Sequence, residues 1–442
     1  MTRHVAIIGG GFSGTMLAVQ LLRRGLGRVT LIERSGPPGR GLAYGAAHPT
    51  HLLNVRAAGM SAYADDPGHF VRWLETRTAE EAAASFAPRL VYADYVQEQL
   101  REAAAAAPGR LELVEDDATD IAEAAGRVTV SLAGGERIEA DAAVLAIGNS
   151  PPKPPRMLAQ AKLPPERFFA DPWLPGATAG LGSDDSVLVI GTGLTMVDVV
   201  LLLDQRGFSG PILAVSRRGL LPRPHAAGPP PKPLSEVPIP IASRLLREVR
   251  EQGESVGWRH AVDSLRPVTQ DLWQKAAVEV RGRFLRHLRP WWDVHRHRIA
   301  PEIHERLQAM VDRGQLRVAA GKLVGAENRP DGIAIDWRPR GASETAQMTV
   351  ARIINCTGPE ADLRATADPL LRTLVGRGTI RPDPLGIGVE VDDASRIVAG
   401  DGRVQDRLFA VGPITRGTFW EIVAVPDIRA QLAGVAERLA KD

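Results

Sequence analysis

The sequence predicts an α/β protein of two interleaved halves, each built on a twisted parallel sheet, with a helical insert in the second half. Apolar runs of strand length are followed at once by glycine-rich turns and amphipathic helices, once near residue 9 and again near residue 191. The length of 442 residues also exceeds what one hydrophobic core usually holds, so two domains are expected.

The composition is that of a globular protein, with 44% hydrophobic and 24% charged residues. The formal net charge of +2 gives no reason to expect a nucleic acid partner. No apolar run reaches membrane-spanning length, so we expect no membrane partner. The single cysteine, Cys356, excludes an internal disulfide, a CxxC pair and a cysteine-based zinc site, and favours a reduced, cytoplasmic setting. The sequence carries no signal of oligomeric state.

The first glycine-rich turn is typical of a dinucleotide site. An apolar strand over residues 4–8 leads into Gly9, Gly11 and Gly14 in G-x-G-x-x-G register, and a helix is expected over residues 15–24. Gly9 allows the tight turn, Gly11 lets the backbone approach a pyrophosphate, and Gly14 lets helix pack on strand. The helix N-terminus offers N–H groups to the phosphates.

The strand that follows, residues 28–32, ends in Glu33, where an acid would hydrogen-bond a ribose. Its negative charge would repel a 2′-phosphate. We therefore expect FAD or NAD at this site in preference to NADP.

A second turn repeats this pattern after a strand over residues 186–190. The loop comprises Gly191, Thr192, Gly193, Leu194 and Thr195, and Met196 stands where the third glycine is expected. This larger side chain should widen the packing of helix on strand.

The next strand, residues 212–215, ends in Ser216, Arg217 and Arg218 instead of an acid. Arginine here suits a 2′-phosphate, so the second site is expected to bind NADPH, although two solvated surface arginines would give the same pattern.

The remaining elements join the halves. We expect a hairpin over residues 128–140, sheet strands over 142–147, 353–356 and 408–411, and a final helix beginning near Phe419. The predicted domains are residues 1–170 and 340–442 for FAD, and 175–339 for NADP(H) with a helical insert at about 240–311. In that insert His295, His297 and His304 fit a solvated helix face better than a metal site, so no metal is expected.

Longer stretches carry a resemblance to known families. They are GGGFSG (9–14), GRGLAYG (39–45), HLLNVRAAGMS (51–61), VLVIGTGLTMVD (187–198), SRRGLLPRPH (216–225), RFLRHLRPWWDVHRHRIAP (283–301) and FAVGPITRGTFWEIVAVPDIR (409–429). Together they resemble a bacterial FAD/NAD(P)-binding protein family and, more distantly, the class B flavin monooxygenases, which include N-hydroxylases and Baeyer-Villiger enzymes. Two features depart from the pattern: Arg56 replaces a proline of the flavin loop, and the monooxygenase linker motif is absent.

The resemblance implies a fold of two Rossmann-like dinucleotide-binding domains and a set of FAD contacts. The flavin ring is expected under residues 53–61 and against the N-terminus of the last helix, whose dipole would stabilise the reduced ring. Asn54 and Ser61 are the candidate catalytic side chains, although Asn54 would serve equally well as a turn cap. The full FAD set is Gly9, Gly11, Phe12, Ser13, Gly14, Glu33, Arg34, Arg40, Ala43, Tyr44, Leu53, Asn54, Met60, Ser61, Gly148, Gly412 and Thr418.

The first functional hypothesis is an NADPH-dependent flavin monooxygenase, in which oxygen adds to the C4a carbon of reduced FAD and then attacks a small molecule. The second is an NAD(P)H-dependent flavoprotein reductase or dehydrogenase. The single cysteine excludes its disulfide-reductase branch. A flavin-bound sensor without catalysis is a third.

Overall fold

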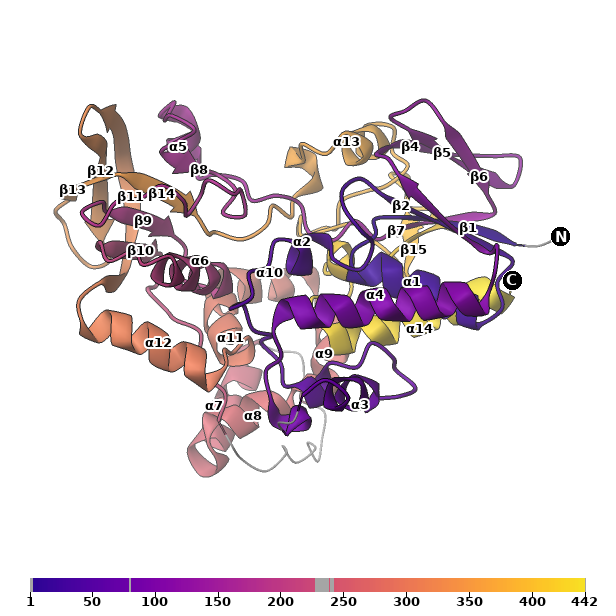
Figure 1. Cartoon of the computed structure of the whole chain (residues 1–442), viewed down its shortest axis with the longest axis horizontal. Coiled ribbons are helices and arrows are strands. Elements are labelled where there is room, and N and C mark those ends of the chain that lie inside the picture. The colour runs from indigo at the N-terminus through magenta and orange to yellow at the C-terminus, as the bar shows by residue number, and fades with distance from the viewer. Residues whose placement is uncertain (1–2, 79–80, 227–237, 239–241, 442) are drawn as a thin grey trace.

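The chain folds into two α/β halves that lie side by side, the first on the right and the second on the left of Figure 1. This computed structural model describes residues 3–78, 81–226, 238 and 242–441. Each half has its own sheet of mainly parallel strands, and the chain passes from the first sheet to the second and back again. The predicted class of two interleaved α/β halves is therefore confirmed.

The first sheet has six strands, in the spatial order β15 (Arg396–Val398), β16 (Val404–Ala410), β7 (Ala142–Leu145), β1 (His4–Ile8), β2 (Arg28–Glu33) and β3 (Leu111–Glu115). Strand β1 is buried along its whole length and pairs in parallel with β2 and β7, as its unbroken apolar run requires. Strand β16 comes from the far end of the sequence and pairs in parallel with β7.

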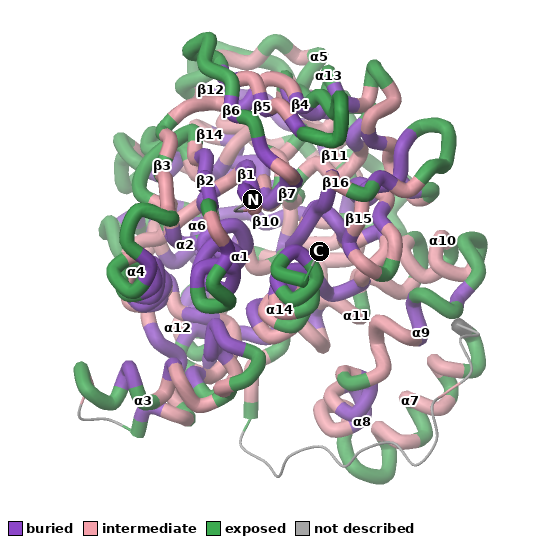
Figure 2. Tube along the Cα trace, turned by 90° about the vertical axis from the view of Figure 1, so that its right-hand side faces the viewer, coloured by how far each residue is buried: buried purple, intermediate pink, exposed green. Residues whose placement is uncertain are grey.

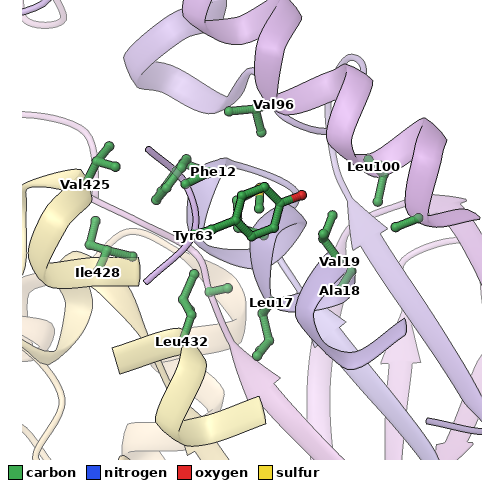
Figure 3. Packing of buried hydrophobic residues seen from close by; sticks show 14 of the residues in the cluster. Phe12, Leu17, Ala18, Val19, Tyr63, Val96, Leu100, Val425, Ile428 and Leu432 are labelled. Atoms are coloured by element: carbon green, nitrogen blue, oxygen red, sulfur yellow. The ribbon is translucent and has the colours of Figure 1, made fainter. Parts of the chain in front are cut away.

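Helices cover one face of this sheet, namely α1 (Phe12–Arg23), α4 (Arg89–Ala106) and α14 (Val425–Lys441). Figure 3 shows their apolar side chains meeting in one core, with Leu17, Val96 and Leu432 contributed by the three helices in turn. The other face carries a small antiparallel sheet and one helix. These are β4 (Ala118–Ala124), β5 (Arg127–Leu132), β6 (Arg137–Ala140) and α13 (Pro369–Gly376).

The second sheet has seven strands, in the order β13 (Ala346–Val350), β12 (Gly332–Pro339), β11 (Leu316–Arg329), β10 (Ile212–Ser216), β9 (Val187–Ile190), β14 (Arg352–Asn355) and β8 (Phe168–Phe169). Helices α6 (Leu194–Gln205) and α12 (Pro301–Asp312) share a core on one face. Strands β13 and β14 belong to this sheet, so the boundary expected at residue 340 falls inside it.

The helical insert is present over the described residues from Ala242 onward. It contains α7 (Ala242–Val256), α8 (Trp258–Ser264), η3 (Arg266–Val268), α9 (Thr269–Lys275), α10 (Val278–His287) and α11 (Arg289–Arg296). Its first expected residues, 240 and 241, lie outside the described part. The insert does not pack on the second half alone, because Trp273 of α9 packs with Trp420 and Ile387 of the C-terminal part of the chain.

The last helix begins later than expected. Glu421 has a φ of +70°, which no α-helix accommodates, so α14 begins at Val425 and not near Phe419. Pro426 is its second residue, where the missing N–H costs nothing.

The short elements are α2 (Gly41–Gly45), η1 (Ala57–Gly59), α3 (His69–Glu75), η2 (Ala82–Ala84), α5 (Arg156–Gln160), η4 (Leu363–Ala365) and η5 (Gly412–Thr415). Along the Cα trace in Figure 2, the sheets are largely buried while the outer turns of the insert helices are exposed. Within the described residues, no helix is both long and apolar enough to cross a membrane.

Candidate functional site

The two glycine-rich turns have the same backbone geometry. Gly9 follows β1 with a φ of +104°, and Gly191 follows β9 with a φ of +109°. A Cβ atom on Gly9 would come within 2.6 Å of the Ala146 carbonyl oxygen, and one on Gly191 within 2.2 Å of the Cys356 oxygen. Both turns therefore require glycine, for conformation and for space.

Each turn leaves a helix N-terminus open. Gly11 is the N-cap of α1 and Gly193 that of α6, and among the described residues no side chain caps either helix. A Cβ atom on Gly11 would meet only Gly41, at 3.7 Å, and one on Gly193 would meet nothing within 4 Å. The first N–H groups of both helices are thus free, and the turns fit the pyrophosphate of a dinucleotide.

Gly14 fixes how closely α1 approaches its strand. A Cβ atom there would lie 1.8 Å from the Gly9 carbonyl oxygen. The corresponding residue of α6 is Met196, which is fully buried in the core of the second half. That α6 lies farther from its strand than α1 does from β1 stays a prediction.

The ends of the second strands differ between the halves. Glu33 Oε2 accepts a hydrogen bond from the Gly10 N–H at 2.6 Å, so this carboxylate supports the first turn directly. In the second half Ser216 takes its place: its hydroxyl lies 2.9 Å from the Thr192 hydroxyl and accepts from the Gly219 N–H at 2.9 Å. The second site therefore lacks the negative charge of the first.

The two arginines after Ser216 have different surroundings. Arg217 is exposed, and its guanidinium forms no hydrogen bond or ion pair with a described residue. Arg218 donates to the His287 carbonyl oxygen at 3.3 Å and lies 5.8 Å from the ring centre of Trp291, so the insert holds it in place. Their contact with a 2′-phosphate stays a prediction.

Two cationic residues of the predicted FAD set are already paired. Arg34 lies 2.8 Å from Asp368 and 3.4 Å from Asp117, and Arg40 lies 3.4 Å from Asp94. Both sit in the loops that border the first turn. Their pairs hold these loops, whether or not the side chains also reach FAD.

Four other members of the set, Phe12, Tyr44, Leu53 and Met60, are core residues of the first half, whereas Ala43 is exposed on α2. Burial raises the pKa of the Tyr44 hydroxyl, so this phenol stays neutral. The contact of these residues with FAD stays a prediction.

The two candidate catalytic residues, Ser61 and Asn54, have different surroundings in the structure. The Ser61 side chain is fully buried, and its hydroxyl donates to the Asp66 carbonyl oxygen at 2.6 Å, as a turn residue does. We therefore do not propose Ser61 as catalytic.

Asn54 is half-buried, and its backbone oxygen accepts from His225 Nε2 at 2.9 Å. Burial lowers the pKa of His225, so a neutral imidazole joins the flavin loop to the loop that carries Arg217.

The last three predicted FAD residues are Gly148, Gly412 and Thr418. Gly148 and Gly412 follow strands with φ of +70° and +75°. A Cβ atom on Gly412 would come within 2.4 Å of Ser13 Oγ, so this glycine lies directly against α1. Thr418 is not at a helix N-terminus, and its hydroxyl donates to the Val391 oxygen at 2.9 Å.

A buried polar cluster, missed in the sequence, joins the insert to the C-terminal segment. The Glu421 side chain is 5% exposed, and its Oε1 accepts from Trp292 Nε1 at 2.8 Å and lies 3.4 Å from His297 Nε2. Arg296 Nε lies 3.3 Å from Oε2, outside hydrogen-bond geometry. Despite burial, His297, Arg296 and Trp292 lower the pKa of Glu421 to about 2, while Glu421 raises that of His297. Glu421 thus combines a left-handed backbone with a buried, charged carboxylate that joins the insert to the C-terminal segment.

A cavity of about 660 Å³ lies elsewhere, between α14, η3 and residues 393–395. Its walls include Arg266, Gln431 and Asp427, but neither glycine-rich turn. Within the described residues, no group of His, Cys, Asp or Glu side chains is arranged to hold a metal ion.

Comparison with known proteins agrees with this geometry. Residues 6–150 match the family described as FAD-NAD(P)-binding. No curated protein sequence matches.

Solved structures share the fold along the whole chain. An ornithine N-hydroxylase of Kutzneria sp. 744, solved with reduced FAD, NADP⁺ and L-ornithine, has a TM-score of 0.66 at 17% identity, with 99% of each chain covered. An L-lysine 6-monooxygenase from Pseudomonas syringae has a TM-score of 0.68 at 17% identity, with 99% of each chain covered. Thioredoxin reductase of T. acidophilum has a TM-score of 0.57 at 11% identity, over 100% of this chain and 99% of that one. The expected resemblance to two-dinucleotide flavoproteins is confirmed at the level of fold.

Proposed function

We propose that the protein is an FAD- and NADPH-dependent oxidoreductase, and specifically a flavin monooxygenase that acts on a small molecule. The observation that carries this proposal is the pair of equivalent, uncapped glycine turns at Gly9 and Gly191, one in each half of the chain. The first turn, with Glu33 beside it, would hold FAD. The second, with Ser216 in place of the acid and Arg217 exposed next to it, would hold NADPH.

The residues present fit both groups. The cradle at Gly11 is open to a pyrophosphate, and Gly412 brings the C-terminal segment against Ser13 of α1. When bound, FAD supplies the redox chemistry: it accepts a hydride from NADPH and activates oxygen. The chain orients the two nucleotides, keeps Tyr44 and the other wall residues apolar or neutral, and excludes water.

The reductase alternative is supported by the thioredoxin reductase fold, but this chain has only Cys356, whose thiol is buried. Burial raises the pKa of that thiol well above its usual range, so it is not a nucleophile at neutral pH. Passing electrons to a protein disulfide through a cysteine pair is therefore not available to this chain.

The substrate class is suggested by the structural neighbours, whose names specify ornithine and lysine. We propose a primary amine as the first class to test. Each turnover would then convert amine, NADPH, H⁺ and O₂ into hydroxylamine, NADP⁺ and water. The low cysteine content supports a reducing, cytoplasmic setting.

The test is stoichiometry. Purified protein with FAD is supplied with NADPH and ¹⁸O₂ together with ornithine, lysine or cadaverine, and products are identified by mass. One labelled oxygen atom in the product per NADPH consumed supports the monooxygenase. NADPH oxidation with hydrogen peroxide as the only oxygen product, for every amine and for a wider panel of nucleophiles, supports the reductase. Failure of NADPH to reduce the flavin under anaerobic conditions refutes both.

A further inference from the structure

The segment that follows Gly412 carries a cation, Arg416, close to the first glycine-rich turn. Residues 412–415 form η5, and Arg416 caps its end. A 3₁₀-helix rises about 2 Å per residue, which keeps Arg416 within about 8 Å of Gly412. Gly412 itself lies against Ser13 of α1. Arg416 is therefore next to the place where the FAD-binding turn and the C-terminal segment meet.

The Arg416 side chain is held in position by a neutral contact. Its Nε donates to the Ile387 carbonyl oxygen at 3.1 Å. Among the described residues no carboxylate lies within ion-pair distance of its guanidinium. Burial, and then the nearby Arg289, lower the pKa of Arg416 to about 10. A desolvated cation is costly without a partner, so this arrangement suits a ligand that brings negative charge.

The carboxylates around Arg416 are committed to other groups. Asp383 accepts from the Ile387 N–H at 2.6 Å and the Leu385 N–H at 3.2 Å, and a Cβ on Gly417 would come within 2.4 Å of it. Asp293 pairs with Arg289 at 3.3 Å, and Glu360 Oε1 accepts from the Ala361 and Asp362 N–H groups at 2.8 Å and 2.9 Å. Within the described part of the chain, none of these three acids forms an ion pair with Arg416.

The helix whose dipole the sequence suggested for this place begins after Arg416 and Thr418, so neither residue lies in its first turn. Helix α14 begins at Val425, and the effect of a helix dipole falls off within its first turn. Arg416 is the charged side chain of this segment that could replace the helix dipole.

We propose that Arg416 is the cation that faces the electron-rich N1–O2 edge of the bound flavin and raises its reduction potential. The inference rests on the proposed function, because it needs FAD in the first site. Hydride transfer adds two electrons and one proton to the ring, so the reduced ring carries a negative charge when no further proton is taken up. A guanidinium without a protein partner stabilises that charge more than the charge of the oxidised ring, which is neutral.

The experiment measures the two-electron potential of the bound flavin against a reference dye. Arg416→Gln removes the charge, Arg416→Lys keeps it, and Arg283→Gln is the matched control, because Arg283 is an exposed arginine of α10. We expect Arg416→Gln to shift the oxidised-to-reduced ratio at a fixed potential at least tenfold toward oxidised, which corresponds to about 30 mV for a two-electron couple. Arg416→Lys and Arg283→Gln should stay within about threefold of the unmodified protein.

Several results would overturn the inference. Equal potentials for Arg416→Gln and Arg283→Gln mean that Arg416 does not face the ring. An equal fall for the lysine and glutamine variants means that shape and not charge is responsible. A raised substrate KM with an unchanged potential assigns Arg416 to the substrate. If purified unmodified protein does not bind FAD at all, the proposed function fails first, and this distinguishes the two failures. Formation of a sulfite adduct, which needs the same cation, gives a second readout if Arg416→Gln binds FAD weakly.

Discussion

Arg89 and Asp198 form a two-pronged ion pair that ties the halves of the protein together. Nη1 and Nη2 of Arg89 lie 2.7 Å and 2.9 Å from the two carboxylate oxygens of Asp198, and the side chains are only 13% and 9% exposed. Arg89 is the first residue of α4 in the first half, and Asp198 lies on α6, the helix of the second glycine turn. His51 Nε2 lies 3.2 Å from the Asp198 backbone oxygen. The pair therefore fixes α6 and the second glycine-rich turn relative to the first half.

The first prediction concerns this pair. Arg89→Ala leaves the Asp198 carboxylate buried without its partner and should lower the free energy of unfolding by about 3–5 kcal/mol. Urea denaturation of the protein without cofactors measures this. Lys275→Ala is the control, because it breaks an exposed pair with Asp271 and should cost about 1 kcal/mol or less. Similar losses for the two variants would show that the junction does not depend on Arg89.

The second prediction separates folding from cofactor binding in one turn. Gly14→Ala places a Cβ 1.8 Å from Gly9 O, so it should destabilise the protein by about 1–3 kcal/mol or more through overpacking. Gly11→Ala meets nothing closer than 3.7 Å and should change stability by about 0.5 kcal/mol or less, yet it should lose FAD.

Its control is Gly193→Ala in the second turn, which has open space and should keep FAD while losing affinity for NADPH. FAD content and nucleotide titrations measure these outcomes. Full FAD content in Gly11→Ala would remove this turn from the cofactor site.

The third prediction tests whether Arg217 and Arg218 bind the 2′-phosphate of NADPH. Replacing Arg217 and Arg218 by alanine deletes charge-assisted contacts of about 1.5–3 kcal/mol that NADH does not make, so the preference for NADPH should fall about tenfold to a hundredfold. Rates of anaerobic flavin reduction with each nucleotide measure the preference.

Arg217→Ala alone is the cleaner variant, because Arg218 also contacts His287 and Trp291 of the insert. If the rate of flavin reduction falls equally with NADPH and NADH, neither arginine recognises the 2′-phosphate.

The fourth prediction concerns pH and the Glu421 cluster. The folded pKa of Glu421 is about 2 against an ordinary value of 4.5, so its contribution to stability is present above pH 4.5 and is lost as pH falls toward 2. The pKa of His297 is raised above 6.5, so its contribution is full below pH 6.5 and is lost as pH rises through the folded pKa.

Unfolding free energy measured against pH should therefore decline on both sides. His297→Gln should flatten the alkaline decline and also reduce the acid one, because His297 is the main group that lowers the pKa of Glu421. An unchanged alkaline slope in that variant would mean that the imidazolium contributes nothing to docking of the insert.

Much of the fold could be predicted because its signals are local. The runs before Gly9 and Gly191, and the turn geometry that only glycine adopts, lie within a few residues of each other. The alternating burial of β5 is likewise visible as alternating residues in the sequence. The periodicity of apolar residues and the preferences of turn residues are visible over such short stretches. The sequence could therefore predict both sheets and the insert.

The rest depends on distant contacts. The Trp292–Glu421 hydrogen bond joins residues 129 apart, and nothing near Glu421 in the sequence signals its left-handed backbone. That one φ is also why the last helix starts late. The sequence also made Ser61 a catalytic candidate, because it is a polar residue in the loop expected near the flavin. In the structure its hydroxyl donates to a backbone oxygen of its own turn.

The position of β16 also has a consequence for synthesis on the ribosome. Strand β7 can pair with β1 early, but its other edge waits for residues 404–410, which emerge only near the end of translation. Until then the nascent first sheet carries an unpaired apolar edge beside a core that still lacks α14, while the whole second half is being made and can fold. The first half of the protein is thus started first and completed last. From the synthesis of β7 until that of β16, which covers more than half of the chain, the free edge of β7 is open to strand pairing with other chains.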